Sequence, residues 1–472
     1  MTKPQITYNL FEYGSPASYK GDVNSLDSLD VFLDDIWNKR EHSNLAFWGA
    51  EESLSNSQRF IDISRKTGSL SLKSNKYVGV IKYKNTIINL LPKIFSDKKN
   101  EPSKDEVKAI QSHILWWLSY CRKLKFPMSL SSFNQQKSNF FEVLIYLFSS
   151  YTKEVLSNMI YQTYQDVENE LPYMRGRVDF NKYASNNYPN GNQHILPCRY
   201  DSFEIDNGFN RIVKFVTKLL IVFTQEADNK KNLREILFAL DEVKDVQSTI
   251  YDCEKVNVNP LFSNMNIILD YCKLFLSNST VMSYKDKFEV FAFLLPMEYV
   301  FEDFILGFIM KEMKGVVVSA QDKSKYLTEN KAFQLRPDLV FYINGKKIIA
   351  DTKYKMIYPH NPNDKKFGIS QSDMYQMLAY AVRNKSKEIK LFYPSTIDTL
   401  KQENNISYKI IDELAEMQSI AIDAFQLPII KSNWKEVDKR TVNLAQSFDE
   451  LRQELKTSLN KILLDTIHVI KE

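Results

Sequence analysis

The sequence predicts an α+β protein of several domains: a β-rich N-terminal region, a mainly helical middle region and a C-terminal region with a mixed sheet. Its 472 residues, 44% hydrophobic and 25% charged, suffice for two or three folded domains. The apolar spacing changes along the chain from strand-like alternation to helical spacing, and then to a mixture of both. These changes predict domains at residues 1–100, 101–284 and 285–395, with a C-terminal extension over residues 396–472.

The N-terminal region is predicted to consist of short strands. Residues 78–83 and 86–91 are two β-prone runs, and the dipeptide Lys84-Asn85 between them is typical of a hairpin turn. Residues 96–106 combine charges with Pro and Ser, which is typical of a linker. We therefore expect a compact β domain that ends at this linker.

The middle region is predicted to be helical. Runs that start at residues 110, 140 and 208 carry apolar residues three and four positions apart, and the second run extends to residue 165. Between the second and third runs the chain is polar and rich in Asn, which predicts an exposed loop or extended arm over residues 174–200.

Three arginines lie in or next to this arm. Arg175, Arg177 and Arg211 are cationic groups flanked by polar residues, which suits them to DNA phosphate contacts or to a partner interface. The alternative is structural: Asp206 or Asn207 caps the helix that follows, and Arg211 helps to tie down the arm.

The C-terminal region is predicted to be a mixed α/β domain. A helix through residues 297–313 precedes two strands, a helix around residues 373–384 and a strand at residues 388–394. The remaining chain adds a strand near residues 421–430 and an amphipathic helix over residues 445–467.

Composition excludes several classes of function. The net charge of +4, from 62 basic and 58 acidic residues, excludes a polycationic DNA coat, so any nucleic-acid site must be local. None of the 12 glycines forms a phosphate-binding loop motif. Four widely spaced cysteines argue against a zinc site and a disulfide framework, and favour a reducing cytoplasm. The start lacks a signal-peptide pattern, and acidic residues interrupt the most apolar stretch, residues 288–310, so we expect no membrane span.

One predicted hairpin brings two acids together. The dipeptide Asn344-Gly345 lies between two β-prone runs and is a strong signal for a two-residue turn. If Ile343 pairs with Lys346, the same register places Asp338 directly opposite Asp351. Like charges at such positions repel each other, so a positive charge is expected between them.

A magnesium ion meets that requirement. Mg²⁺ prefers oxygen ligands and is commonly held by one or two carboxylates, here Asp338 and Asp351. Lys353 lies two residues beyond Asp351 on the same face, where its ammonium could stabilise an attacking hydroxide. The three residues form a coherent hydrolytic set. The alternative is a surface hairpin in which Lys353 merely pairs with the acids.

These residues resemble a nuclease signature. Pro337-Asp338 together with Asp351-Thr352-Lys353 is similar to the active-site motif of the PD-(D/E)xK nucleases, with Thr352 as a small filler. The resemblance implies catalytic roles for Asp338, Asp351 and Lys353.

Two further features match this superfamily. Gln376 and Tyr380 resemble the QxxxY motif of its RecB-like branch, which implies that they order the site and contact DNA. Glu298 and Glu302 are one helical turn apart, and the upstream helix of such nucleases often contributes an acid, which implies Glu302 as a third metal ligand and catalytic residue. Taken alone, Gln376 and Tyr380 would be interpreted as ordinary helix-surface residues. The two glutamates alone would be interpreted as part of a solvated helix face.

The resemblance extends beyond this domain. Residues 77–95, 175–183 and 200–214 are similar to McrC, the nuclease subunit of McrBC 5-methylcytosine restriction systems, and LlaJI-like restriction nucleases share this architecture. This implies a PD-(D/E)xK core in the C-terminal domain and a Mg²⁺-dependent endonuclease acting on double-stranded DNA in defence. It also implies a separate AAA+ GTPase of the McrB kind, bound through the N-terminal domain and stimulated by this chain.

Two alternatives stay open. The chain could be a non-catalytic activator of the partner NTPase, with the hairpin acids vestigial. It could also be a free-standing RecB-like nuclease, although the McrC-like N-terminal and middle sections count against that interpretation.

Overall fold

The computed structural model contains two compact units, Met1–Val143 with Ser277–Glu472, and Leu144–Leu276. Each is described by itself. The structure describes residues 6–21, 23–39, 59–66, 69–83, 86–97, 101–122, 140–278, 283–284, 287–288, 290–320, 325–343, 345–358, 363–400, 405–412, 418–435 and 444–464.

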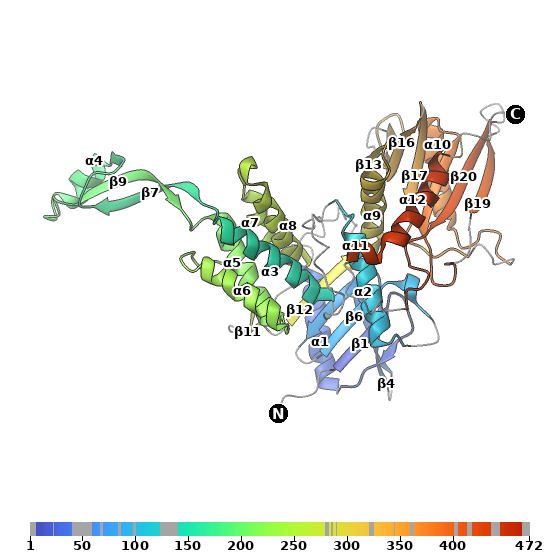
Figure 1. Ribbon diagram of the computed structural model, residues 1–472, viewed down its shortest axis with the longest axis horizontal. Helices are drawn as coiled ribbons and strands as arrows, with labels where there is room; N and C mark the ends of the chain where they lie inside the picture. The colour runs from blue at the N-terminus through green and yellow to red at the C-terminus, as the bar shows by residue number, and fades with distance from the viewer. Residues whose placement is uncertain are drawn as a thin grey trace. The chain divides into compact units, whose positions relative to one another are not determined.

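A four-stranded sheet forms the N-terminal part of the first unit. Its order is β1 (Ile6–Phe11), β6 (Thr86–Leu91), β5 (Tyr77–Tyr83) and β12 (Val290–Pro296). The predicted hairpin of β5 and β6 is confirmed, with Tyr83 paired to Thr86, while its turn Lys84-Asn85 lies outside the described residues. Helix α1 (Val23–Lys39) shares the apolar core of this sheet (Figure 1).

A second, smaller sheet shares this core. It consists of β2 (Ala17–Ser18), β4 (Ser69–Ser74) and β3 (Ile61–Lys66). Leu72 of β4 is fully buried with Leu26 of α1 and Ile88 of β6. The described residues of the N-terminal region are therefore β-rich, and helix α1 closes their core.

Strand β12 joins this sheet from far along the chain. It lies in the range predicted for the nuclease core, yet it pairs with β5 and leads directly into α9 (Met297–Glu312). At Gly79 of β5 a Cβ atom would lie 1.9 Å from the backbone oxygen of Phe293, so only glycine allows the two strands to approach.

A six-stranded mixed sheet forms the rest of the first unit. Its strands, in spatial order, are β13 (Val317–Ala320), β16 (Leu339–Ile343), β17 (Lys346–Thr352), β18 (Glu388–Pro394), β20 (Gln418–Leu427) and β19 (Asn405–Asp412). Strands β17, β18 and β20 are parallel, and the outer pairs are antiparallel. The sheet thus extends beyond residue 395 into the segment predicted as a C-terminal extension.

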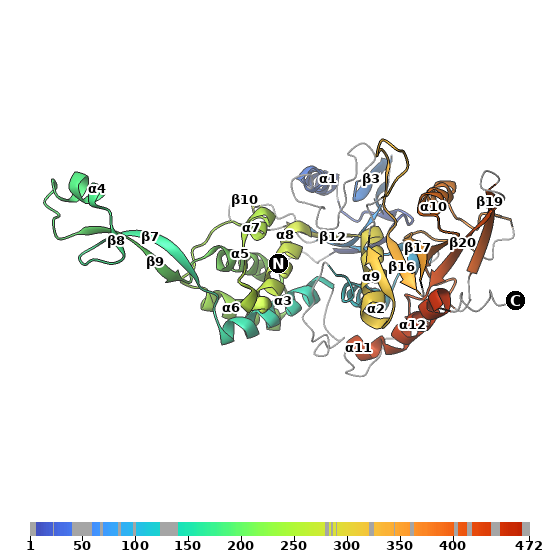
Figure 2. The ribbon, with the colours of Figure 1, turned by 90° about the horizontal axis from the view of Figure 1, so that it is seen from above.

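Helices cover this sheet. Helix α10 (Gln371–Asn384) buries Met377 against Ile389 and Leu391 of β18. Helix α12 (Asp449–Leu464) lies on the opposite side of the sheet (Figure 2). The predicted C-terminal amphipathic helix is confirmed, in two pieces, since α11 (Leu444–Ser447) precedes α12. Small elements complete the unit: β10 (Ser283–Tyr284), β11 (Lys287–Phe288), β14 (Lys325–Tyr326), β15 (Gln334–Leu335) and a 3-10 turn (Lys93–Phe95).

Helix α2 (Lys104–Leu118) begins inside the predicted linker, so the linker prediction is wrong for residues 104–106. The physical reason is a capping box. The Ser103 hydroxyl accepts a hydrogen bond from the Glu106 backbone, and the Glu106 carboxylate accepts one from the Ser103 backbone. Trp116 and Trp117 of this helix are buried, as expected of core residues.

The second unit is a group of helices with an extended arm. Its helices are α3 (Phe140–Asn158), α5 (Gly208–Phe223), α6 (Ala227–Ala239), α7 (Ile250–Lys255) and α8 (Ser263–Asn278), with a 3-10 turn (Pro260–Phe262). The arm is a ribbon of β7 (Thr163–Leu171) and β9 (Leu196–Glu204), which pair along nine residues (Figure 1). Its tip carries β8 (Arg177–Val178), α4 (Phe180–Lys182) and a π-helical turn (Tyr183–Asn187).

The ribbon corrects one prediction. The helix expected to continue to residue 165 ends at Asn158, and residues 163–165 already belong to β7. The reason is the antiparallel pairing with β9 along nine residues, whose inter-strand hydrogen bonds replace those of a helix. No helix in the described part of the chain is long and apolar enough to cross a membrane.

Candidate active site

The two predicted acids lie at the ends of adjacent strands. Strands β16 and β17 pair in the register expected from the sequence, with Ile343 opposite Lys346 and Leu339 opposite Ala350. Gly345 adopts φ +76°, as the turn requires, while Asn344 lies outside the described residues. The hairpin therefore carries Asp338, directly before Leu339, to the end of β17.

A threonine holds the first carboxylate. Asp338 Oδ2 accepts hydrogen bonds from the Thr352 backbone N–H at 2.8 Å and from the Thr352 hydroxyl at 2.7 Å. Sequence reasoning treated Thr352 only as a small residue between Asp351 and Lys353. The structure gives it a positioning role that a hydroxyl, but not a methyl group, can perform.

The second carboxylate is almost completely buried. Asp351 is 1% exposed, and its Oδ2 forms an ion pair with the Lys353 ammonium. Beyond that ion pair, Oδ2 accepts no hydrogen bond from the part of the chain that the structure describes. This oxygen can therefore still bind a cation.

The electrostatics of the site favour a further positive charge. Burial, then repulsion from Asp338, raises the pKa of Asp351 to about 8. Burial also raises the pKa of Asp338. For Lys353, burial works to lower the pKa, but attraction to Asp351 and Asp338 outweighs it and raises the pKa. A buried and a half-buried carboxylate thus both attract the Lys353 ammonium, and a divalent cation would stabilise both in their charged form.

Gln376 and Tyr380 lie at this site. Lys353 Nζ donates to Gln376 Oε1 at 3.1 Å, and Gln376 Nε2 donates to the Tyr380 hydroxyl at 2.8 Å. The Tyr380 hydroxyl donates to the Arg336 backbone oxygen at 2.9 Å, two residues before Asp338. Since Tyr380 is 2% exposed, the helix-surface interpretation does not fit it.

Helix α9 brings Glu302 towards the pair. Burial and Asp338 are the larger causes of the raised pKa of Asp351, Lys353 opposes them, and the negative charge of Glu302 raises the pKa further. Glu298, by contrast, is half exposed and lies 3.5 Å from the Lys76 ammonium. No three His, Cys, Asp or Glu side chains among the described residues lie close enough to hold a metal. Since Mg²⁺ needs only one or two carboxylates beside water and phosphate oxygens, Asp338 and Asp351 still fit it.

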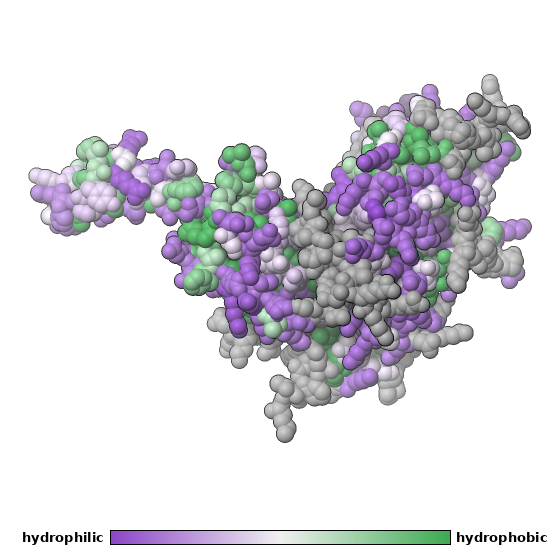
Figure 3. Space-filling model, viewed as in Figure 1, coloured by the Kyte–Doolittle hydropathy of each residue, from purple (hydrophilic) through white to green (hydrophobic). Residues whose placement is uncertain are grey.

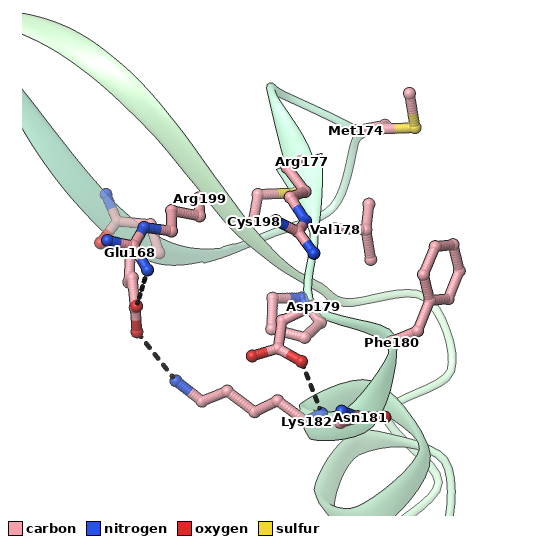
Figure 4. Close-up of a pocket in the computed structure, with 12 residues that line it drawn as sticks. Glu168, Met174, Arg177, Val178, Asp179, Phe180, Asn181, Lys182, Cys198 and Arg199 are labelled. Atoms are coloured by element: carbon pink, nitrogen blue, oxygen red, sulfur yellow. Dashed lines mark hydrogen bonds and ion pairs between the residues drawn. The ribbon is translucent and has the colours of Figure 1, made fainter.

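Arg175 and Arg177 lie on the arm of the second unit, whereas the two acids belong to the first. The Arg175 guanidinium lies 4.0 Å from the centre of the Tyr200 ring. Arg177 lines a pocket of about 680 Å³ with Lys182 and Arg199 (Figure 4). Arg199 and Lys182 each form an ion pair with Glu168. The pocket therefore mixes both signs of charge.

For Arg211 the structure supports the alternative role, in which its side chain holds the arm in place. Its guanidinium donates to both carboxylate oxygens of Asp206, at 2.7 and 2.9 Å. Asn207 caps α5 by accepting a hydrogen bond from the Asn210 backbone at 3.0 Å, and it donates to the Tyr161 backbone oxygen at 2.9 Å. These bonds tie the base of the arm to the helices of its own unit.

The comparisons with known proteins identify a family and a fold. The model of the McrBC 5-methylcytosine restriction system component family matches residues 72–394. No curated protein matches the chain.

Two solved structures resemble it, both from Thermococcus gammatolerans. One is a half-complex from a tetradecameric assembly of McrB AAA+ hexamers with bound McrC, with a TM-score of 0.67, 18% identity, and coverage of 97% of this chain and 100% of that chain. The other is a McrBC complex, with a TM-score of 0.48, 18% identity, and coverage of 65% and 87%. The first likeness shows a shared fold along nearly the whole chain.

Proposed function

Because the chain belongs to the family of McrBC 5-methylcytosine restriction system components, we propose that it is the Mg²⁺-dependent, DNA-cleaving subunit of such a system. The observation that carries the proposal is the carboxylate pair of half-buried Asp338 and buried Asp351 with Lys353 beside it. This arrangement, at the ends of two paired strands of a mixed sheet, supports a PD-(D/E)xK nuclease core.

The residues fit a hydrolytic role. Asp338 and Asp351 would hold Mg²⁺, and Glu302 would approach it from α9. When bound, Mg²⁺ acidifies a water molecule and neutralises charge on the phosphodiester. Lys353, oriented by Gln376, directs its ammonium towards the charge that develops on the phosphate.

A motor partner is the second part of the proposal. The Thermococcus gammatolerans structure contains McrB AAA+ hexamers with bound McrC, and we propose an equivalent AAA+ GTPase partner for this chain, bound through the N-terminal domain. Double-stranded DNA is the proposed substrate.

The arm supplies a second partner surface. Residues 163–204 include six acidic and four basic residues, a net charge of −2, which disfavours DNA phosphates as their ligand. Tyr164 and Phe203 are 74% and 55% exposed, with ring centres 5.0 Å apart. Figure 3 shows hydrophobic residues in green among hydrophilic ones along the arm. Exposed aromatics of this kind favour a protein partner, and with it the partner-interface alternative for Arg175 and Arg177.

Substitution of the acids tests the nuclease assignment. In the presence of the partner, Mg²⁺ and plasmid DNA, Asp351→Asn and Asp338→Asn should each lower the cleavage rate about 100-fold or more, since a lost carboxylate weakens metal binding and charge stabilisation. Both variants should still bind the partner. Asp62→Asn, on an exposed position of β3, is the matched control and should cleave like the wild type.

The alternatives give other results. Partner GTP hydrolysis stimulated equally by wild type and Asp351→Asn, with no metal-dependent cutting by either, would identify a non-catalytic activator. Cutting that needs no partner would identify a free-standing nuclease. Cleavage retained by Asp351→Asn would refute the catalytic assignment.

A further inference from the structure

The backbone that carries Lys353 lies beyond the regular pairing of its strand. Strand β17 ends at Thr352, and the Lys353 backbone N–H donates to the Phe392 oxygen at 2.8 Å. The Lys355 N–H then donates to the Lys353 oxygen at 2.8 Å, so the chain turns tightly at Tyr354. The position of the Lys353 ammonium therefore depends on how Tyr354 is held.

Tyr354 is held by the N-terminal sheet. Its side chain is 3% exposed, and its hydroxyl donates a hydrogen bond of 3.0 Å to Oε2 of Glu12, which directly follows β1. The same oxygen accepts a hydrogen bond of 3.1 Å from the Lys93 backbone N–H. The Lys93 ammonium lies 4.6 Å from the centre of the Tyr354 ring. One buried carboxylate oxygen thus joins the N-terminal sheet to the residue beside Lys353.

Tyr354 also contacts the helix on the other side of the site. Its ring centre lies 6.1 Å from that of Phe301, the residue before Glu302 on α9. Helix α9 continues directly from β12, a strand of the N-terminal sheet. Both elements that flank the carboxylate pair are therefore fixed to the same sheet.

Packing alone does not explain why a glutamate occupies position 12. The residue is 3% exposed, and burying a carboxylate is unfavourable, whereas an apolar residue could fill the same space without that penalty. Burial raises the pKa of Glu12 to about 7, against the opposing effect of Lys93 and of the hydrogen bond from Tyr354. A directional hydrogen bond, unlike apolar packing, fixes the position of the Tyr354 hydroxyl.

We propose that Glu12 and Tyr354 are a positioning pair that sets the place of Lys353 and couples the N-terminal domain to the active site. The inference deepens the proposed function, since it rests on Lys353 acting in DNA cleavage. A change in the N-terminal sheet, such as one caused by a bound partner, would reach the Lys353 backbone through the hydrogen bond between Glu12 and Tyr354.

Hydrogen exchange of the full chain tests the pair without DNA or partner. Tyr354→Phe removes only the hydroxyl, and exchange of the Lys353 and Lys355 amides should become about tenfold faster, because one anchoring hydrogen bond is lost. The matched control is Tyr393→Phe on β18. The Tyr393 hydroxyl is buried and has no hydrogen-bond partner among the described residues, so the same change there should leave these amides unaffected.

Kinetics separate positioning from simple packing. In the complete system, Tyr354→Phe should lower kcat for DNA cleavage about tenfold and leave KM for DNA unchanged, because Tyr354 is buried and its side chain is not accessible for contact with DNA. Glu12→Ala should act in the same way. The double variant should be no worse than Glu12→Ala alone, since Glu12→Ala already removes the hydrogen bond that Tyr354→Phe removes.

Two results would overturn the inference. One is equal hydrogen exchange of the Lys353 and Lys355 amides in Tyr354→Phe and Tyr393→Phe. The other is faster exchange of these amides in Tyr354→Phe with an unchanged kcat for DNA cleavage. If the wild type does not cleave DNA in an Asp351-dependent manner, the proposed function fails. The exchange measurement then decides by itself whether the pair holds the Lys353 backbone.

Discussion

The chemistry of individual side chains explains why the candidate site needs a cation. Asp351 is buried and Asp338 is half-buried, and the Lys353 ammonium forms an ion pair with Asp351. The raised pKa of Asp351, near 8, means that the second carboxylate ionises with difficulty until more positive charge arrives. Mg²⁺ binding should therefore release protons, as expected for a site whose ligands must be deprotonated.

Glu12 should make stability depend on pH. Its pKa rises from 4.5 to about 7 on folding, mainly through burial. A carboxyl group with a raised folded-state pKa stabilises the fold below its unfolded pKa, and this contribution is lost as the pH rises through the folded value. Between pH 5 and pH 8, at most about 3 kcal/mol of the free energy of unfolding should disappear in the wild type.

The comparison variant is Glu12→Gln, which keeps the shape but cannot ionise. Chemical denaturation of both proteins across this pH range measures the effect, since other titrating groups cancel in the difference. The stability advantage of the wild type should shrink as the pH rises. Parallel curves would show that Glu12 ionises normally.

Some site residues were predictable from the sequence and others were not. Asp338, Asp351 and Lys353 lie within one short hairpin, so turn type and strand alternation were enough to bring them together. Glu12 lies 342 residues before Tyr354, and no local pattern marks it as a partner. Its role arises only from the packing of a separate sheet against the strand end.

At the scale of elements, the turn between β16 and β17 can be tested through its glycine. Gly345 and Gly191 both adopt φ +76°, and a Cβ at either position would meet no atom within 4 Å. Valine at either glycine should therefore cause about 1–2 kcal/mol of backbone strain without a steric clash. Only Gly345→Val should lower DNA cleavage, because that turn sets the register of the two acids.

The measurement is the rate of plasmid cleavage by the two variants side by side. Gly191, at the tip of the arm, has the same φ as Gly345 and equally open surroundings. Gly191→Val should therefore leave the cleavage rate unchanged. A fully active Gly345→Val protein would show that the turn does not control the register.

Sequence patterns predicted elements well where contacts are local. The strands β5, β6, β16 and β17 form hairpins, and each pair was found from β-prone runs around a short turn. The strands β7 and β9 were missed because most of their residues are exposed or half-buried on both faces, so they lack the alternation of a core strand. Ser103 was missed as a helix cap because it lies inside a charged stretch typical of linkers.

At the scale of the whole molecule, the arm should contribute to partner binding beside the N-terminal domain. Tyr164→Ala combined with Phe203→Ala removes the exposed aromatic pair and should weaken binding of the AAA+ partner about tenfold or more, as expected for aromatic residues at the centre of an interface. Binding can be measured by analytical ultracentrifugation or by interferometry.

The control is Phe238→Ala on α6, an aromatic residue that is 85% exposed in the same unit. It should bind the partner like the wild type. Equal binding by the double arm variant and the control would remove the arm from the interface and leave the N-terminal domain as the proposed contact.

The sequence did not reveal which of the strands that lie far apart in the chain belong to the same sheet. The change in apolar spacing predicted three regions, but it could not show that β12 completes the N-terminal sheet or that β19 and β20 extend the C-terminal one. Pairing between strands far apart in sequence depends on tertiary packing, and a short stretch of sequence carries no information about that packing.

The pairing of β5 with β12 has a consequence for the order of events during synthesis. Val290 of β12 pairs with Tyr83 of β5, so the whole unit Leu144–Leu276 is translated between the two halves of one sheet. The contacts of the helical unit lie within its own segment, which favours its folding first on the ribosome, while the pairing across it has high contact order and forms late. Until β12 emerges, β5 has an unprotected edge, and the nascent chain is then most prone to aggregate.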